Sequence, residues 1–296
     1  MFEGSLVALA TPFDRNNRID FVALERLIDY HVDQGSDGLV IAGTTGESAT
    51  LEQAEHVELI RRAADLAGGR LPVIAGTGSN STRQTIDLSL AVADCAIDAY
   101  LLVVPYYNKP VQEGLYRHFA AIADAVSKPV MLYNVPGRTV ADLLPETLGR
   151  LAGHPNIFGI KDATGSMQRL EQNRAATPSD FRHYSGDDFT TLSFLKGGGH
   201  GVVTVSGNVA PALMAGMCRA VREGRVADAE ANDALLQPLN TALFLESNPI
   251  PVKWALQEMG LIGEGIRLPL TVYDEQFHGQ MRDAMANAGI SAGKAA

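Results

Sequence analysis

The chain has 296 residues, of which 46% are hydrophobic and 20% charged, and it carries a formal net charge of −10. This composition is typical of a globular protein with a large core, and the acidic balance argues against nucleic-acid binding, which needs a basic face. No apolar run reaches the roughly 18 residues of a membrane-spanning helix, and the N-terminus lacks the features of a signal peptide. The two distant cysteines, Cys95 and Cys218, suit free thiols, so we expect a cytoplasmic protein without nucleic-acid or membrane partners.

Eight short hydrophobic runs, rich in β-branched residues, recur along the chain and predict β-strands. Most of them are continuous rather than alternating, which is typical of parallel strands covered on both faces. The runs span residues 5–10, 38–42, 72–75, 99–104, 129–133, 157–161, 182–185 and 201–205.

Helical patterns separate these runs, with apolar residues three to four positions apart. They span residues 19–34, where Asp20 is a candidate N-cap, and 53–67, 81–93, 114–126, 144–151, 188–197 and 210–222. The alternation of eight strands with helical segments predicts an α/β fold, the (β/α)8 TIM barrel. A doubly wound open sheet is the alternative, but it usually has a glycine-rich first turn, which residues 9–14 (LATPFD) do not provide.

The pattern changes after Gly224, where strand signals end. Residues 226–246, 250–259 and 273–287 are predicted to be helical, and the tail 291–296 to be disordered. We therefore divide the chain into a catalytic barrel, residues 1–224, and a C-terminal helical extension, residues 225–296.

In a (β/α)8 barrel the active site lies where the strands end and in the loops that follow them. These positions carry hydroxyl, phenol, guanidinium and amine groups, from Thr44, Thr45, Tyr106, Tyr107, Tyr133, Arg138 and Lys161. The seven histidines lack the spacing of metal ligands, so we expect neither a metal nor another cofactor.

Lys161 is the most unusual of these residues, because it ends an apolar strand and lysine is seldom buried. A surface lysine paired with Asp162 would be the commoner arrangement for this residue alone. The convergence of the other groups favours a nucleophile, since a desolvated lysine tends to be neutral. A neutral amine forms an imine with a ketone, and the enamine derived from it attacks an aldehyde. Phenols and hydroxyls would relay the protons, and an arginine would hold a carboxylate.

Motifs along nearly the whole chain resemble those of the dihydrodipicolinate synthase family, within the class I pyruvate aldolases. They are VALATPF, GTTGES, GTGSNST, PYYNKP, YNVPGRT, GIKDATG, SGDD, ESNPIPVKWAL and GIRLPL. GTTGE is shared with sialic-acid lyases and keto-acid aldolases, whereas the arginine of YNVPGRT, Arg138, is the discriminating residue. The resemblance implies condensation of pyruvate with L-aspartate 4-semialdehyde to 4-hydroxy-tetrahydrodipicolinate, the first committed step toward lysine and diaminopimelate.

The same resemblance implies roles for the catalytic side chains. Lys161 would form the Schiff base with pyruvate, and Tyr133 would act beside it as general acid and base. Thr44 and Tyr107 would complete a proton relay, with Tyr107 reaching in from a neighbouring subunit. The site would then require a dimer, and the family implies a homotetramer built as a dimer of dimers.

Further residues would bind the two substrates. The turn that holds Thr44 and Thr45 would bind the pyruvate carboxylate, and Arg138 the carboxylate of the semialdehyde. Gly186 and Val203 would offer main-chain carbonyls.

Many family members are inhibited by lysine at a subunit interface. The matching positions here are Ser48, Ala49, His56, Asn80, Gln84 and Tyr106. Sensitive relatives commonly have a glutamate where this chain has Gln84, and an amide cannot give a ligand ammonium the same charge-assisted contact. We therefore expect weak or absent inhibition, although these residues could also simply line a wet interface.

Two other functions stay open at this stage. A sibling aldolase or lyase that acts on a keto-deoxy sugar acid or on N-acetylneuraminate would keep Lys161 and Tyr133 but replace the Arg138 contact. A barrel that has lost catalysis and serves as a sensor would usually have a broken set of active-site residues, whereas here the set is intact.

Overall fold

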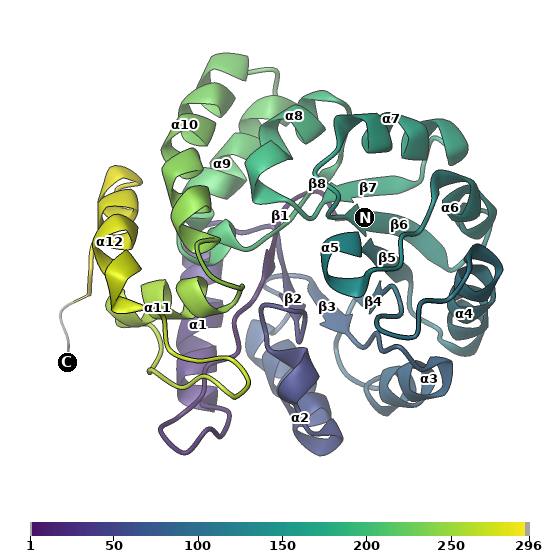
Figure 1. Ribbon diagram of the computed structural model, residues 1–296, viewed down its shortest axis with the longest axis horizontal. Coiled ribbons are helices and arrows are strands. Elements are labelled where there is room, and N and C mark those ends of the chain that lie inside the picture. Colours follow the sequence, from purple (N-terminus) through teal and green to yellow (C-terminus); the bar gives the residue numbers. More distant parts are fainter. Residues whose placement is uncertain (1, 294–296) are drawn as a thin grey trace.

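The eight predicted hydrophobic runs form eight parallel strands that close into a barrel, with β8 pairing back to β1 (Figure 1). The computed structural model describes residues 2–293. Its strands are β1 (Gly4–Ala8), β2 (Gly38–Ile41), β3 (Val73–Gly76), β4 (Ala99–Val103), β5 (Val130–Asn134), β6 (Ile157–Asp162), β7 (Arg182–Ser185) and β8 (Gly201–Thr204). The predicted barrel is confirmed, and the alternative prediction of a doubly wound open sheet is wrong.

The two faces of each strand enter different parts of the core. In β5, Met131 and Tyr133 belong to a cluster inside the barrel, whereas Val130 and Leu132 pack outward against the helices. Successive side chains of a strand point to opposite faces, and here both faces are buried. This is why the strand signal in the sequence is a continuous apolar run.

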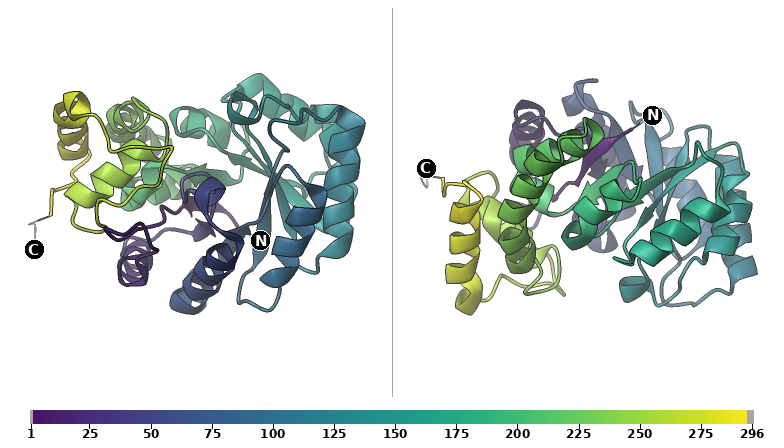
Figure 2. Two further views of the ribbon diagram at one scale, coloured as in Figure 1. Left: turned by 60° about the horizontal axis from the view of Figure 1, so that its bottom comes forward. Right: turned by 90° about the horizontal axis from the view of Figure 1, so that it is seen from above.

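Helices surround the barrel on its outer side (Figure 2). They are α1 (Phe21–Asp33), α2 (Gln53–Ala67), α3 (Thr82–Ala91), α4 (Gln112–Ala125), α6 (Pro145–Ala152), α7 (Met167–Ala176), α8 (Thr191–Lys196) and α9 (Pro211–Arg222). The predicted N-cap is confirmed, because the Asp20 carboxylate accepts the main-chain N–H groups of Val22 and Ala23. This contact satisfies two of the donors that a helix start leaves free.

Two helices depart from the expectations. The sequence analysis did not predict α7, because its ten residues are mostly polar and bury just Leu170 and Asn173. The segment predicted as one helix over residues 188–197 divides into the short 3₁₀ turn η2 (Asp188–Thr190) and α8.

The C-terminal part of the chain is helical, as predicted. It forms α10 (Val226–Leu243), α11 (Ile250–Glu258), the 3₁₀ turn η4 (Glu275–Phe277) and α12 (His278–Asn287), with no strand among residues 225–293. These helices lie together at one side of the barrel, where α10 packs against α9 and α12 (Figure 1). The division of the chain at residue 224 stays a prediction.

Two expectations for the C-terminal part need qualification. The helix predicted over residues 273–287 begins later, at η4. In the tail, Gly293 donates its main-chain N–H to the Glu258 carbonyl at 2.8 Å, and residues 294–296 lie outside the described part. None of the described helices is long and apolar enough to cross a membrane.

Candidate active site

Neighbouring strands place Lys161 and Tyr133 side by side. The two residues are direct partners in the parallel register of β5 and β6, and each is 6% exposed. The Lys161 Nζ lies 4.1 Å from the centroid of the Tyr133 ring. The alternative of a surface lysine paired with Asp162 is therefore wrong, because the side chain is buried against a phenol.

The end of β7 leaves room for the lysine. A Cβ atom at Gly186 would lie 2.8 Å from the Ala163 Cβ and 2.9 Å from the Lys161 Cε, closer than real side chains approach, so a larger residue here would force its neighbours, Lys161 among them, to shift. The Gly186 N–H donates to the Asp162 carbonyl at 2.7 Å and holds the two strand ends together. Val203 lies on β8 and packs its side chain in the cluster inside the barrel.

The GTTGES segment after β2 folds into a tight turn. The Gly43 carbonyl accepts the N–H groups of Gly46 and Ser48, and Glu47 has a φ of 54°, in the left-handed region. Thr44 is half-buried, whereas Thr45 is buried and its hydroxyl accepts a hydrogen bond from the Asn248 side-chain amide at 3.0 Å.

Asn248 also contacts Arg138, which lies on the short helix α5 (Pro136–Thr139). The guanidinium donates to the main-chain carbonyl of Asn248 at 3.2 Å. Thr45 and Arg138, the two residues predicted to bind carboxylates, are therefore joined through a third residue. The sequence analysis did not single out Asn248 as a site residue, although its motif was recognised.

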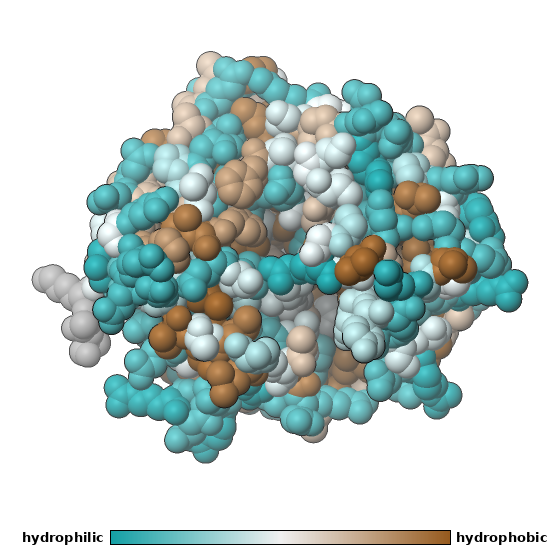
Figure 3. Space-filling view, in the orientation of Figure 1, coloured by the Kyte–Doolittle hydropathy of each residue, from teal (hydrophilic) through white to brown (hydrophobic). Residues whose placement is uncertain are grey.

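Arg138 is exposed at the rim of an open pocket of about 600 Å³. The pocket is also lined by Phe244, Leu245, Glu246, Ser247, Asn248, Ile250, Pro269, Leu270 and Thr271. A space-filling view shows a hydrophobic area at the lower left of this face (Figure 3). Leu268 and Val272, on either side of the pocket residues 269–271, are 78% and 71% exposed.

A buried ion pair fastens the GTTGES turn to the extension. The Glu47 carboxylate accepts a hydrogen bond from the ammonium of Lys253, which lies on α11. It accepts a second one from the main-chain N–H of Arg267 at 3.0 Å. The Lys253 Nζ lies 4.3 Å from the centroid of the Phe13 ring. Burial lowers the pKa of Lys253, and the Glu47 charge opposes that shift. The sequence analysis missed this pair because its members lie 206 residues apart.

The single chain does not bring Tyr107 to Lys161 and Tyr133. Its side chain is 90% exposed, and its φ of 72° is in the left-handed region, which is unusual for an aromatic residue. The hydrogen bonds found among residues 2–293 give its hydroxyl no partner. Tyr106, beside it, is 39% exposed.

Part of the candidate lysine site comes together within one chain. Asn80 donates its side-chain amide to the Tyr106 carbonyl at 3.2 Å, and Gln84 accepts from the Ser79 hydroxyl at 3.1 Å. The His56 Nε2 lies 2.9 Å from the Gly76 carbonyl oxygen, and burial lowers the pKa of this imidazole. Ser48 begins the 3₁₀ turn η1 (Ser48–Thr50), in which Ala49 is exposed.

Comparison with known proteins shows what this chain is similar to. The sequence profile of the dihydrodipicolinate synthetase family matches residues 1–288. The 4-hydroxy-tetrahydrodipicolinate synthase of Methylococcus capsulatus is 55% identical over 290 residues, which are 98% of this chain and 100% of that protein.

Solved structures agree. The chloride-inhibited dihydrodipicolinate synthase of Acinetobacter baumannii, complexed with pyruvate, is 47% identical with a TM-score of 0.96 and covers 98% of this chain and 100% of its own. The enzyme of Cyanidioschyzon merolae with lysine bound is 41% identical with a TM-score of 0.94, and the match covers 97% of this chain and 98% of the other.

Proposed function

The chain belongs to the dihydrodipicolinate synthetase family and condenses pyruvate with L-aspartate 4-semialdehyde, and we propose that it does so through an imine on Lys161. The observation that carries this proposal is the position of the Lys161 amine. It is buried at the C-terminal end of a barrel strand and lies against the phenol ring of Tyr133. Active sites of this fold lie at that end of the barrel.

The proposed reaction begins when the neutral Lys161 amine adds to the keto carbon of pyruvate. The keto oxygen takes up two protons and leaves as water, which gives the imine. The imine nitrogen takes up a proton, and loss of a methyl proton then gives an enamine. Its carbon forms the new bond to the aldehyde carbon of the second substrate, while the aldehyde oxygen takes up a proton and becomes a hydroxyl. Attack of that substrate's amino group on the imine carbon closes the ring and releases Lys161.

Each of these steps moves a proton, and we propose that the phenol of Tyr133, whose ring lies against the amine, acts as general acid and base. We propose that Thr44, half-buried in the turn after β2, continues the relay. Its last member would be Tyr107 of a second subunit, because the Tyr107 side chain points into solvent in one chain.

Carboxylate recognition is divided between two elements in this proposal. The turn with Thr44 and Thr45 would bind pyruvate, while the guanidinium of Arg138 would bind the semialdehyde. Both elements contact Asn248, which supports a shared geometry for the two subsites. The carbonyls of Gly186 and Val203 would face the substrates.

We further propose that the protein is a homotetramer made of two dimers. The exposed side chains of Tyr106, Tyr107 and Val111, in the segment between β4 and α4, support a contact with a second copy, because monomers seldom expose such groups together. The cytoplasm is the expected location, and there the two free, buried cysteines would stay reduced.

Initial rates test the choice of substrates most directly. We expect pyruvate consumption that depends on L-aspartate 4-semialdehyde and no cleavage of N-acetylneuraminate or keto-deoxy sugar acids. Cleavage of a sugar acid without reaction of the semialdehyde would assign the chain to the sibling aldolases. No reaction with any of these compounds, in folded protein, would favour a binding role.

A further inference from the structure

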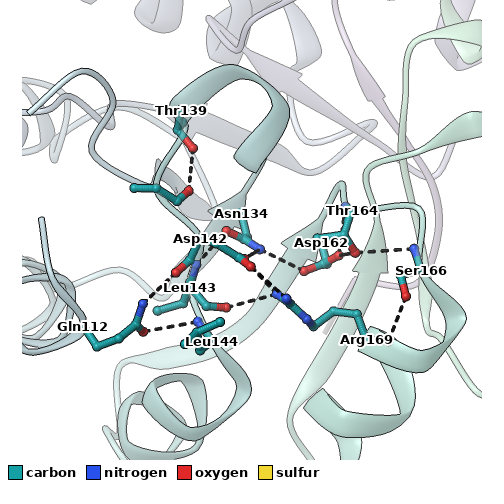
Figure 4. A network of polar contacts seen from close by, with 11 residues as sticks. Gln112, Asn134, Thr139, Asp142, Leu143, Leu144, Asp162, Thr164, Ser166 and Arg169 are labelled. Carbon is teal, nitrogen blue, oxygen red and sulfur yellow. Dashed lines mark hydrogen bonds and ion pairs between the residues drawn. The ribbon is translucent and has the colours of Figure 1, made fainter. Parts of the chain in front are cut away.

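Directly behind the catalytic pair lies a network of buried and half-buried polar side chains (Figure 4). Asn134 and Asp162 each follow a member of the pair, Tyr133 and Lys161, and end the same two strands as direct register partners. Because side chains alternate along a strand, Asn134 and Asp162 point to the outer face of the barrel. Both are buried, and the Asn134 amide donates to the Asp162 carboxylate at 3.2 Å.

Asn134 also closes the segment of residues 135–141, which carries Arg138. Its side-chain oxygen accepts the Leu143 main-chain N–H at 2.9 Å, and its amide donates to the Asp142 carboxylate at 2.9 Å. The last strand residue before the segment therefore holds the first two residues after it. Such side-chain contacts fix both ends of the segment that contains the short helix α5.

The far end of the segment is anchored a second time, from α7. Both terminal nitrogens of Arg169 donate hydrogen bonds to the Asp142 carboxylate, at 2.8 Å each, in the bidentate arrangement that makes such pairs strong. The contact is partly shielded from water, since the side chains of Arg169 and Asp142 are 16% and 30% exposed. The Arg169 guanidinium lowers the pKa of Asp142, as expected of a carboxylate that stays charged.

A third contact extends the anchor to α4. Gln112 donates its side-chain amide to the Asp142 carbonyl at 2.8 Å and accepts the Leu144 main-chain N–H at 3.2 Å. Within the segment, the Thr139 hydroxyl bonds to the Ala141 carbonyl at 2.8 Å. The position of Arg138 is therefore set by hydrogen bonds on both sides of its segment, although its own guanidinium is exposed.

We propose that Asn134, Asp142 and Arg169 are positioning residues that fix the guanidinium of Arg138 relative to the amine of Lys161. None of the three needs to touch a substrate, because the network connects the strand that carries Lys161 to the segment that carries Arg138. A displacement of about 1 Å in a substrate-binding group can cost on the order of 100-fold in rate. The inference rests on the proposed role of Arg138 in binding the carboxylate of the aldehyde.

Steady-state kinetics of the full chain test this inference with Asp142→Asn and Arg169→Gln. We expect each variant to raise the KM for the semialdehyde by about tenfold, and to change the KM for pyruvate and the borohydride trapping of pyruvate less than about twofold. Arg169→Lys keeps the positive charge but not the two-pronged guanidinium, so it should raise the KM for the semialdehyde less than Arg169→Gln does. Asp94→Asn, which removes an exposed pair with Arg61, is the matched control and should have no effect.

Each variant is then repeated in an Arg138→Ala background. If the network acts through Arg138, the variants should no longer change the KM for the semialdehyde, because there is no guanidinium left to misplace. Equal effects in both backgrounds, or equal losses for both substrates, would mean general damage to the fold and would overturn the inference. Should Asp142→Asn fail to fold, Arg169→Gln decides the same question from the other side of the pair.

The two proposals fail differently. If Arg138→Ala alone leaves the KM for the semialdehyde unchanged, the role of Arg138 is wrong and the inference falls with it. If Arg138→Ala raises this KM while the network variants do not, the inference alone is wrong.

Discussion

Lys161 and Tyr133 face each other across β5 and β6, with the lysine Nζ 4.1 Å from the centre of the phenol ring. The lysine is buried, and the phenol supplies a nearby group that can exchange protons. The position therefore favours an amine that reacts over one that forms an ion pair.

Replacing the amine should remove catalysis while the fold survives. We expect Lys161→Ala to lower kcat on the order of 10³-fold or more, because a covalent nucleophile has no substitute in this site. Circular dichroism and thermal unfolding should stay close to those of the parent. Lys196→Ala, which removes an exposed pair with Glu230, should keep full activity. Comparable kcat values for Lys161→Ala and the parent protein would contradict the assignment.

The buried pair of Glu47 and Lys253 should matter more for stability than exposed pairs do. Lys253→Met leaves the Glu47 carboxylate buried without its cation, which costs about 3–5 kcal/mol in the free energy of unfolding. Lys196→Met, at the protein surface, should cost less than about 1 kcal/mol. Urea unfolding of both variants measures the difference. Equal losses would show that the pair adds nothing beyond a surface contact.

Three buried histidines should make the protein sensitive to mild acid. Desolvation lowers the pKa of His31 to about 3, and it lowers those of His118 and His183 to about 4. The unfolded chain binds these protons near pH 6.5, so between about pH 6.5 and 4 it binds more protons than the folded state. The free energy of unfolding must therefore decrease as the pH is lowered through this window, by up to about 1.4 kcal/mol per pH unit for each histidine.

Unfolding in urea at pH 6.5, 5.5 and 5.0 measures this slope. His31→Gln should reduce the slope, because one of the histidines that binds its proton only after unfolding is then removed. His154→Gln, a half-buried histidine paired with the exposed Asp124, is the control and should leave the slope nearly unchanged. A slope that His31→Gln does not alter would show that other groups cause the acid sensitivity.

Lysine should inhibit the protein weakly, and one substitution should strengthen the effect. Gln84→Glu would offer a ligand ammonium a charged acceptor, worth about 1.5–3 kcal/mol, or at least about tenfold in the half-inhibitory concentration. Gln172→Glu, on the exposed side of α7, is the matched control. Inhibition of the parent protein by sub-millimolar lysine would contradict the first part. An unchanged response of Gln84→Glu would contradict the second.

The sequence was sufficient to predict the barrel because each strand is buried on both faces and thus reads as an apolar run. It was not sufficient for α7, whose polar composition hides its helical spacing. Lys161 and Tyr133 could also be predicted as site residues, because they lie at the ends of strands and the fold brings those ends together.

The contacts around these residues could not be predicted. Asn248 meets Thr45 and Arg138 across 203 and 110 residues of chain, and Arg169 meets Asp142 from the helix that was missed. No local pattern marks a buried asparagine as the partner of a distant side chain. Such partners follow from the closed barrel and the docked extension, which exist only after folding.

The central claim is that pyruvate forms an imine with Lys161, and reductive trapping tests it most directly. The folded protein is incubated with pyruvate and borohydride, digested and analysed by mass spectrometry. We expect a stable pyruvate-derived adduct on the peptide that contains Lys161, and none in Lys161→Ala. An adduct on another lysine, or no adduct in protein that condenses the two substrates, would contradict the account.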